Sequence, residues 1–430
     1  MPAMPGQGSR EFPPAWVAFT PPPPPPPSSF LLWLLPYSSI WSALYDNAQR
    51  RHVNSSASPP SVSLPWRFSS SLIMGLTGSI SRAFLFGLNR TEVVGLDRFL
   101  ETLDQRKDVE GRERGLITGT VSGFRTTEYV DDPLIWGVLP FKYAFSPSNH
   151  RWSLGSYDIC FQNKFLTSFF TYGQVLPTHR NDYSPIHGGL FQPTMTQAIR
   201  LLSSQPFTKT LTTEASPTTS DPFSGGSLTY STTGTDNFPA PSAYPSRRHS
   251  WVHIFPEGRV HQHPNKSLRY FKWGVSRLIL ESEPLPDIIP IFIDGNQQIM
   301  HEAREFPRFL PRVGKDIKIA FGEKVDGEKV FGELRAQWKR LVKLQKEALV
   351  KKGLATDLEM GELTEGLKYN SEAVALRKEV TRRIRLEVLK VRRELRYPDE
   401  DPKEGLVETW VEEGAKKTGK MEDGSWVGKT

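Results

Sequence analysis

Residues 251–259 read WVHIFPEGR, and this stretch indicates the class of fold that the surrounding chain adopts. Its first five residues are largely apolar and suit a short buried strand. Pro256 and Gly258 would end that strand, because proline cannot donate to a sheet ladder and glycine favours turns. Glu257 and Arg259 would then project from the carboxyl edge of a sheet, where open α/β sheets bind ligands. An ordinary strand-to-loop turn is the alternative.

Apolar runs and helical patterns alternate on both sides of this stretch. We expect further strands at residues 115–118, 288–293 and 317–321. Residues 267–280 are expected to form a helix, because their apolar side chains recur on one helical face. Strands that alternate with helices predict an α/β sheet flanked by helices.

A pair of aspartates precedes a proline at residues 131–133. Aspartate is a favoured helix N-cap and proline a favoured first helical residue, so we expect Asp132 to cap a helix. Asp131 would then be free to orient another group. A capped helix with a solvated neighbour is the alternative.

Arg180 follows an apolar stretch that contains Gly173 and Pro177. An arginine at the end of a strand suits a phosphate, because its planar fork donates two parallel hydrogen bonds. A solvated surface arginine is the alternative.

Composition divides the chain into four parts. Residues 1–63 are rich in proline and serine and are expected to be disordered. Residues 64–90 form an amphipathic segment, and residues 91–326 the main domain. Within that domain, residues 203–250 contain almost no aliphatic side chains and are expected to be a disordered insertion that the fold does not need. Residues 327–430 are highly charged and are expected to form long surface helices and a polar tail.

The segment 64–90 carries an apolar residue at every fourth position over much of its length. Such a row lies along one face of a helix and usually packs on a core. The arginines and the lack of acidic residues favour the alternative, an interfacial membrane helix. Arg82 would make a full membrane span costly. The row consists of Leu72, Leu76, Ile80, Phe84 and Leu88.

The overall composition excludes several classes of protein. The chain holds 54 basic and 47 acidic residues, and its net charge of +7 is mild for a nucleic-acid binder. None of the usual nucleic-acid motifs accompanies that charge, so we expect no nucleic acid as partner. The single cysteine, Cys160, excludes an intramolecular disulfide framework. No stretch has the length and apolar character of a typical transmembrane helix.

Five stretches of the sequence together resemble the tafazzin family of the glycerolipid acyltransferase superfamily. They follow the family's order and spacing between about Trp66 and Gly322, apart from the insertion. The resemblance implies an α/β acyltransferase fold. The stretches are DDPLIWG at 131–137, GQVLPTHR at 173–180, FPEGR at 255–259, LRYFKWGVSRL at 268–278 and Pro290 in an apolar run.

The resemblance implies roles for individual residues. Asp131 matches the aspartate of the family's catalytic His-x-x-x-x-Asp pair. Arg180 matches the arginine that holds the glycerophosphate of the substrate. The residues that the resemblance implies in substrate binding are Gly173, Pro177, Arg180, Glu257, Gly258, Arg259 and Pro290.

The catalytic histidine of the family is missing from this chain. Where the family reads approximately LITVSNH, four further residues and DDP, this chain reads LITGTVSGFRTTEYVDDP from Leu116. Thr126 stands five positions before Asp131, and residues 111–131 contain no histidine. A complete replacement between two well-matched flanks indicates an error in the gene model, and a true pseudoenzyme is the alternative.

We expect no other histidine to serve as a substitute base. His150 follows an asparagine, as the family's histidine does, but no aspartate stands five positions after it. The sequence aligns His179, His253 and His261 with no aspartate either. Because a hydroxyl is a poor nucleophile until a base removes its proton, we expect the chain as written to be nearly inactive.

The resemblance implies acyl exchange between a phospholipid and a lysophospholipid, notably from phosphatidylcholine to monolysocardiolipin to give mature cardiolipin. It implies no coenzyme A and no metal, and a site on the mitochondrial inner and outer membranes that faces the intermembrane space. One alternative is an acyl-CoA-dependent lysophospholipid acyltransferase. Because the histidine is missing, a catalytically dead lipid-binding protein is another alternative.

Overall fold

The structure is a computed structural model that describes residues 61–122, 131–181, 183–207, 228–257, 268–299, 310–353, 359–406, 408–409, 419–420 and 426–427. All of them belong to one unit, Ser38–Thr430. The predictions for the N-terminal 60 residues and for most of the C-terminal tail lie outside the described residues. The same holds for Thr126, Gly258, Arg259 and His261.

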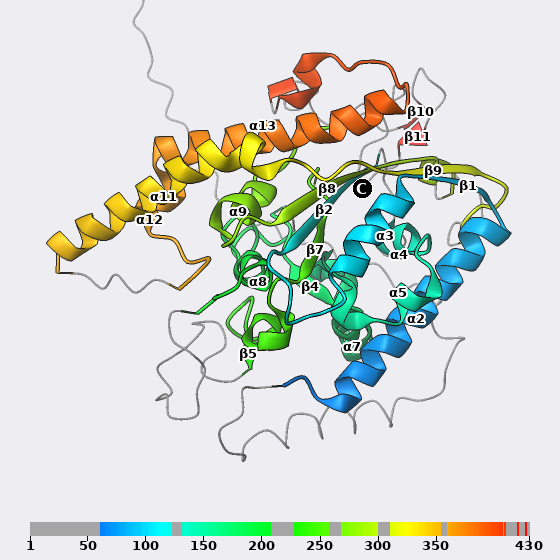
Figure 1. The fold of residues 1–430 in the computed structure, drawn as a ribbon, viewed down its shortest axis with the longest axis horizontal. Helices are drawn as coiled ribbons and strands as arrows, with labels where there is room; N and C mark the ends of the chain where they lie inside the picture. The colour runs from blue at the N-terminus through cyan, green and yellow to red at the C-terminus, as the bar shows by residue number, and fades with distance from the viewer. Residues whose placement is uncertain are drawn as a thin grey trace, which may run out of the picture. The chain divides into compact units, whose positions relative to one another are not determined.

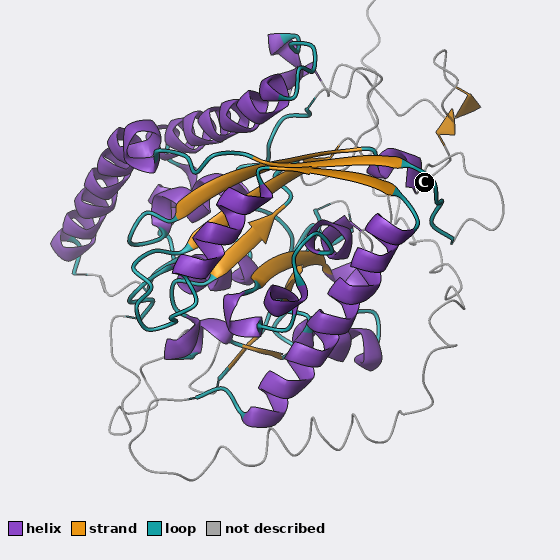
Figure 2. Ribbon diagram, turned by 45° about the vertical axis from the view of Figure 1, so that its right-hand side comes forward, coloured by secondary structure: helices purple, strands orange, loops and turns teal. Residues whose placement is uncertain are grey.

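A seven-stranded sheet runs through the described part of the chain in the order β1-β9-β8-β2-β7-β3-β4 (Figures 1 and 2). Strands β8, β2, β7, β3 and β4 are parallel, whereas β9 is antiparallel to β8 and pairs in parallel with β1. The predicted α/β sheet is therefore confirmed. The strands are β1 (Arg90–Val94), β2 (Leu116–Ser122), β3 (Arg151–Ser156), β4 (Val175–Thr178), β7 (Trp251–Ile254), β8 (Asp287–Asp294) and β9 (Asp316–Phe321), with two small antiparallel pairs, β5 (Thr229–Tyr230) with β6 (Phe238–Pro239) and β10 (Gly419–Lys420) with β11 (Trp426–Val427).

Successive residues of the central strands point to opposite faces of the sheet, as the pleat requires. Leu116 and Trp251 belong to the hydrophobic core on one face, whereas their neighbours Ile117 and Val252 belong to the core on the other. Both faces of the parallel strands are therefore buried, which explains why these strands read as nearly continuous apolar runs.

Two groups of helices cover these faces (Figure 1). Helices α2, α3, α4 and α5 contribute to one core, and α8, α9, α11, α12 and α13 to the other. The helices are α2 (Leu64–Gly87), α3 (Leu96–Gln105), α4 (Asp131–Trp136), α5 (Phe141–Ala144), α6 (Tyr157–Cys160), α7 (Lys164–Tyr172), α8 (Pro193–Leu202), α9 (Gly274–Glu281), α10 (Asn296–Ile299), α11 (Gly327–Lys351), α12 (Glu365–Tyr369) and α13 (Ser371–Glu394).

The helix expected over residues 267–280 begins later, at Gly274. Backbone N–H groups of the preceding residues donate hydrogen bonds to the turn that follows β7 instead of to carbonyl oxygens within a helix. The backbone N–H of Lys272 donates to the carbonyl oxygen of Pro256, and that of Arg269 donates to the carboxyl group of Glu257, both at 2.7 Å. The prediction was wrong here because periodicity does not reveal that these donors have partners outside the segment.

The two long C-terminal helices, α11 and α13, form where the charged periodic sequence predicts them. Each buries one face and exposes a charged one. Phe331 and Trp338 of α11 and Val380 and Val388 of α13 belong to the same core as Val252 of the sheet. Helix α13 packs directly against β8 of the sheet, whereas α11 packs on α9, α12 and α13.

The prediction of a disordered insertion is wrong for residues 203–207 and 228–250, while residues 208–227 lie outside the described residues. The hairpin β5–β6 places Tyr230 and Phe238 in a third hydrophobic cluster, together with Phe161. Aromatic side chains here take the place of the aliphatic residues that the segment lacks. This part of the insertion therefore belongs to the fold.

Arg247, also in the insertion, connects it to the start of α2. Its guanidinium carbon lies 4.0 Å from the centroid of the Trp66 ring and 4.9 Å from that of Trp152. A cation that lies over two aromatic rings gains from both. The composition of the insertion alone gives no sign of this contact, because both tryptophans lie far away in the sequence.

Candidate active site

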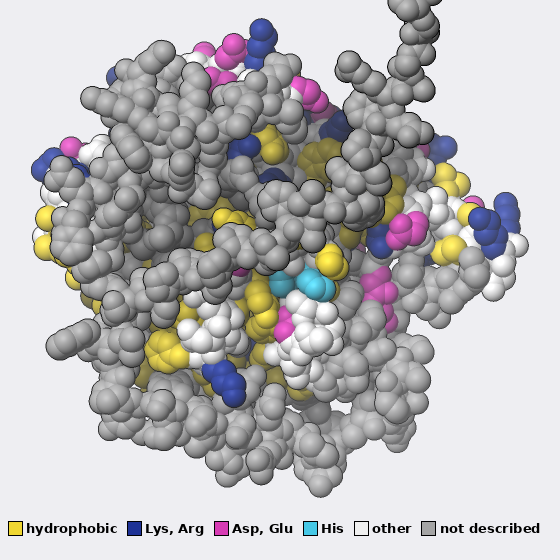
Figure 3. Space-filling view, turned by 180° about the vertical axis from the view of Figure 1, so that it is seen from behind, with side chains coloured by type: hydrophobic (Ala, Val, Ile, Leu, Met, Phe, Trp, Pro, Cys, Tyr) yellow, Lys and Arg dark blue, Asp and Glu magenta, His cyan; other side chains and the backbone are white. Residues whose placement is uncertain are grey.

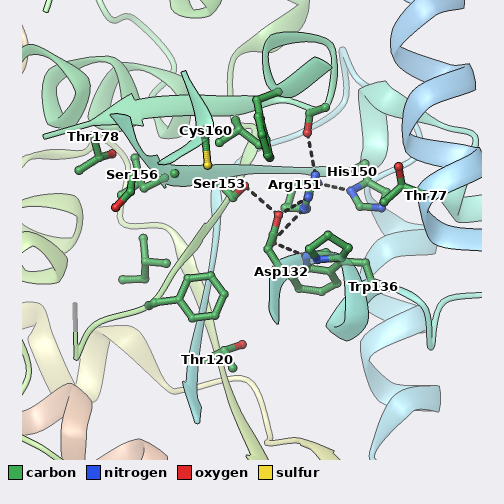
Figure 4. A pocket seen from close by; sticks show the side chains of 18 of the residues that line it. Thr77, Thr120, Asp132, Trp136, His150, Arg151, Ser153, Ser156, Cys160 and Thr178 are labelled. Carbon is green, nitrogen blue, oxygen red and sulfur yellow. Dashed lines mark hydrogen bonds and ion pairs between the residues drawn. The ribbon is translucent and has the colours of Figure 1, made fainter. Parts of the chain in front are cut away.

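The carboxyl edge of the parallel strands borders a cavity of about 250 Å³ (Figure 4). Arg180 and Glu257, which were predicted to bind substrate, both line it, together with Asp132, which was predicted only to cap a helix. Its walls are otherwise largely apolar and include Ile73, Met74, Phe169, Phe170, Met195 and Val275. A cavity of this kind suits a ligand with a polar head and an apolar chain.

Asp132 does not cap α4, which begins one residue earlier than expected, at Asp131. Its carboxylate accepts hydrogen bonds from Trp136 Nε1 at 2.7 Å, Arg151 Nε at 3.3 Å and Ser153 Oγ at 3.1 Å (Figure 4). Arg151 Nη2 also donates to it. The predicted capping role was wrong, because a buried arginine supplies stronger, charge-assisted donors.

The Asp132–Arg151 pair is an ionised pair in a buried wall of the cavity. Burial alone would raise the pKa of Asp132, but the charge and hydrogen bonds of Arg151 outweigh it and lower the pKa below its usual value. Either partner without the other would be an unpaired buried charge.

Asp131, the predicted catalytic aspartate, is the first residue of α4 and immediately precedes Asp132. Residues 123–130, which connect β2 to this helix and include Thr126, lie outside the described residues. The backbone thus brings Asp131 beside a residue that lines the cavity. Its catalytic role stays a prediction.

Arg180 lines the cavity just beyond the end of β4. Its Nε donates to Asp158 Oδ1 at 3.1 Å, and its Nη2 donates to Oδ2. The guanidinium carbon lies 4.2 Å from the centroid of the Tyr183 ring. These two neighbours hold the planar fork in one orientation. Sequence analysis missed Asp158, because no local pattern pairs residues that are 22 positions apart.

Glu257 follows β7 and lines the cavity as well. It is only 5% exposed, and its Oε1 accepts the backbone N–H of Arg269 at 2.7 Å. Burial raises the pKa of Glu257 to about 8. The carboxyl group is therefore largely protonated at neutral pH, and it can donate a hydrogen bond to an oxygen of a ligand.

This raised pKa predicts a pH dependence of stability. Between pH 4.5 and about 8 the folded protein retains a proton on Glu257 that the unfolded chain has lost. Stability should therefore fall as pH rises through this window, by at most about 1.4 kcal/mol per pH unit from this group. Glu257→Gln keeps the acceptor for Arg269 and cannot ionise, so it should flatten the dependence. Urea unfolding at several pH values measures this.

Glu323→Gln is the matched control, because Glu323 forms an exposed ion pair with Arg98. The control variant should follow the unmodified protein. An unchanged slope in Glu257→Gln would contradict the assignment of a raised pKa.

Two of the predicted substrate-binding residues lie in the sheet framework instead. Pro177 is in β4, an edge strand, where its missing N–H costs no ladder bond. Pro290 lies within β8 and pairs with Gly119 of β2. Neither is among the described residues that line the cavity, whereas Gly173 is. The carbonyl oxygen of Gly173 accepts a hydrogen bond from Arg151 Nη1 at 3.0 Å.

The described histidines differ in their surroundings. His253 is fully buried, and burial lowers its pKa to about 3. His179 shares a 2.7 Å hydrogen bond with the hydroxyl of Thr232, which in turn donates to Asp236. Neither lines the cavity, but His150 does. In the described part of the chain, no three His, Cys, Asp or Glu side chains are grouped to hold a metal ion.

No family model matches the chain. Its sequence is 36% identical over 346 residues to tafazzin from Saccharomyces cerevisiae, and the alignment covers 79% of this chain and 81% of that protein. The chain belongs to the tafazzin family. A second member, taffazin from Dictyostelium discoideum, is 27% identical over 271 residues, with 62% of this chain and 73% of that protein covered.

Two further proteins are similar outside the tafazzin family. N-acylphosphatidylethanolamine synthase from Arabidopsis thaliana is 27% identical over 220 residues, which are 51% of this chain and 59% of that protein. The crystal structure of the 1-acyl-sn-glycerophosphate acyltransferase from Thermotoga maritima covers 72% of this chain and 88% of its own, with 12% identity and a TM-score of 0.35. Membership of the tafazzin family confirms the predictions of an acyltransferase and of a role in phospholipid metabolism.

Proposed function

We propose that the protein transfers an acyl chain from phosphatidylcholine to monolysocardiolipin without coenzyme A. The observation that carries this proposal is the cavity of a tafazzin-family chain in which Arg180 and Glu257 adjoin apolar walls. A lysophospholipid has the corresponding parts, namely an anionic phosphate, a free hydroxyl and an apolar chain. Arg180 would bind the phosphate, and the apolar walls would hold the chain.

The reaction needs a base for the hydroxyl of the acceptor. With its phosphate at Arg180, the acceptor would hold its hydroxyl near the start of α4, where a histidine oriented by Asp131 would act. Imidazole suits this role because it titrates near neutral pH, and a carboxylate behind it stabilises the imidazolium. Thr126 occupies the family's position for this histidine. We propose that residues 119–130 come from a faulty gene model.

Acyl transfer with a labelled chain tests the activity. Phosphatidylcholine is the donor and monolysocardiolipin the acceptor, each assay being run with and without coenzyme A. We expect equal transfer in both, provided that the chain carries a restored histidine. Transfer that requires acyl-CoA would favour the acyl-CoA-dependent alternative, and lipid binding without any transfer would favour the dead lipid-binding protein.

The phosphate role of Arg180 predicts a specific loss of binding. Arg180→Lys keeps the charge but removes the fork that Asp158 orients, so affinity for lysophosphatidic acid below its micelle concentration should fall about ten-fold. Isothermal titration measures this with the chain as written, because no turnover is needed. Arg90→Lys is the control, since Arg90 forms a similar two-bond pair with Asp316, at 2.5 and 2.9 Å, on the far edge strand β1. Equal affinity in Arg180→Lys would remove Arg180 from the site.

Helix α2 exposes a row of apolar side chains, each between 37% and 75% exposed. Apolar side chains are also visible on the face drawn in Figure 3, and the row on α2 runs along a 24-residue helix. Such a contiguous apolar surface indicates an interaction site. The predicted row shifts toward the N-terminus, because Phe84 packs against the core. The exposed row consists of Leu64, Phe68, Leu72, Leu76 and Ile80.

We propose that this row lies in one leaflet of a mitochondrial membrane, facing the intermembrane space. Arg82 does not oppose this, because its Nη1 donates to the carbonyl oxygen of Val138, at 2.9 Å, just beyond α4. Within the described residues, no helix has the length and apolarity needed to cross a membrane. Ile73 and Met74, which line the cavity, lie on the same helix, so lipid would reach the cavity close to the bilayer.

Charges in the row should prevent membrane binding. The double substitution Leu76→Asp and Ile80→Asp is expected to weaken binding to vesicles of phosphatidylcholine and cardiolipin at least ten-fold, because about 1.5–3 kcal/mol accompanies burial of each large apolar side chain. Sedimentation with vesicles measures this. Leu344→Asp, at an equally exposed position of α11, should bind as before. Unchanged binding of the double variant would contradict the proposal.

A further inference from the structure

His150 is the one histidine among the described residues that lines the cavity. It immediately precedes β3, and it is only 5% exposed. The rings of Trp136 and Trp251 hold its imidazole, with centroids 6.1 and 5.6 Å from its own. Thr77 of α2 lies beside it at the cavity wall (Figure 4).

The hydrogen bonds of His150 fix the position of its proton. Its Nδ1 accepts the backbone N–H of Arg151 at 2.9 Å. A neutral imidazole carries one proton, which must then be on Nε2. Burial, followed by the charge of Arg151, lowers the pKa of His150 well below 6.5, so the ring is neutral at physiological pH. None of the described residues accepts a hydrogen bond from Nε2.

This arrangement makes His150 a hydrogen-bond donor and prevents it from replacing the missing base. The lone pair of Nδ1 is already used, and Nε2 already holds its proton. No acceptor in the described part of the protein holds this donor, and His150 lines the cavity. Nε2–H is therefore available to donate a hydrogen bond to an oxygen of a bound ligand.

The position of His150 separates it from the phosphate-binding end of the cavity. Arg180 follows the carboxyl end of β4, whereas His150 precedes the neighbouring parallel strand β3. Asp132 lies between them, bonded to Ser153 in the middle of β3. Figure 4 shows the same order, from Thr178 past Asp132 to His150. Consider an acceptor whose phosphate lies at Arg180 and whose hydroxyl lies near α4. The ester carbonyl of the acyl donor would then lie next to this hydroxyl, at the end of the cavity that His150 lines.

We propose that Nε2–H of His150 binds the carbonyl oxygen of the donor's acyl ester and stabilises the negative charge that forms there. This inference rests on the proposed acyl transfer. The acceptor's hydroxyl oxygen bonds to the carbonyl carbon while the C=O electrons move onto the oxygen beside His150. These electrons re-form the C=O bond as the bond between the carbonyl carbon and the donor's glycerol oxygen breaks. The proton of the acceptor's hydroxyl ends on that leaving oxygen. A fixed donor binds the developing oxyanion more strongly than the neutral carbonyl.

A pair of soluble lipids tests this inference with the full chain and without turnover. Dihexanoylphosphatidylcholine has ester carbonyls, and its dihexyl ether analogue has the same head group without them. Below their micelle concentrations, the unmodified chain should bind the ester about three- to ten-fold more tightly, which is the usual net effect of one hydrogen bond. His150→Met should abolish this preference. His150→Gln, which keeps an N–H donor, should retain part of it.

His187→Met is the matched control, because His187 is not among the described residues that line the cavity. It should keep the full preference for the ester. If His150→Met also keeps it, the inference is wrong while the proposed function stands. If the unmodified chain binds neither lipid, the proposed lipid-binding site is wrong, and the inference about His150, which rests on that site, is wrong as well.

Turnover gives an independent readout in a chain with a restored catalytic histidine. Loss of a donor to an oxyanion lowers kcat about a hundred-fold and leaves KM nearly unchanged. We expect this split for His150→Met and a partial recovery for His150→Gln. A rise in KM with unchanged kcat would show that His150 only packs against the substrate, and would overturn the proposal.

Discussion

Restoring a histidine five positions before Asp131 is expected to raise acyl transfer about a hundred- to ten-thousand-fold. The change replaces residues 119–130 by a segment of the form Val-Ser-Asn-His followed by four residues of the family type. The imidazole would then take the proton of the acceptor's hydroxyl, with Asp131 behind it. Labelled transfer from phosphatidylcholine to monolysocardiolipin measures the gain.

The structure around Gly119 supports this repair. Gly119 lies in β2, and a Cβ added there would have its nearest neighbour, Ile254 Cγ1, at 3.9 Å. It also borders a small void of about 10 Å³ that Pro290 and Val388 help to line. The valine that the family has at this position would therefore fill space in the core instead of causing a clash. The repaired chain should be no less stable than the present one.

The control for the repair is the same segment with alanine in place of histidine. It should fold equally well and stay as inactive as the chain as written. Robust transfer by the unrepaired chain would contradict the role of the histidine. A repaired chain that folds and binds lipid without turnover would favour the pseudoenzyme.

Asp132→Ala is expected to lower the free energy of unfolding by about 3–5 kcal/mol, because it leaves the Arg151 charge buried and unpaired. Urea unfolding measures the loss. The double variant Asp132→Ala with Arg151→Met should lose less than the sum of the two single changes, since no unpaired charge remains. Asp316→Ala, which breaks the exposed pair with Arg90, should have a much smaller effect.

The same pair predicts how stability depends on acid. The pKa of Asp132 is lower in the folded protein than in the unfolded chain, where it is about 3.9. The pair's contribution is therefore fully present above that value and is lost as pH falls through the folded pKa. Asp132→Ala should lack this step at low pH. An identical acid profile in the variant would contradict the lowered pKa.

Local sequence patterns predicted several of the elements that carry the site, but not β3, which carries Arg151 and Ser153. Alternating apolar runs gave the strands β2, β7, β8 and β9, and the fourfold spacing from Leu72 gave the exposed face of α2. The turn after β7 placed Glu257 at the carboxyl edge, and the apolar strand before Arg180 placed that arginine there too. These predictions succeed because strand and helix periodicity and turn residues act within a few positions of the chain.

Composition was a poorer guide to the insertion. Its second half lacks aliphatic residues, yet Tyr230 and Phe238 bury their rings against Phe161. Order there depends on partners from α6, from β4 and from Phe161, which no composition window includes. The same limit explains the late start of α9, whose preceding backbone donors are used by Pro256 and Glu257.

The sequence by itself determined the α/β class, the family and the absence of a histidine before Asp131. Only the tertiary structure decided which side chains pair at the cavity. It joined Asp132 to Arg151, oriented Arg180 with Asp158, and placed His150 at the wall although no aspartate follows it at the family's spacing. The reason is physical. Periodicity indicates which segments form strands or helices and which face each one buries. Hydrogen bonds between side chains from different strands depend instead on how the sheet brings distant segments together.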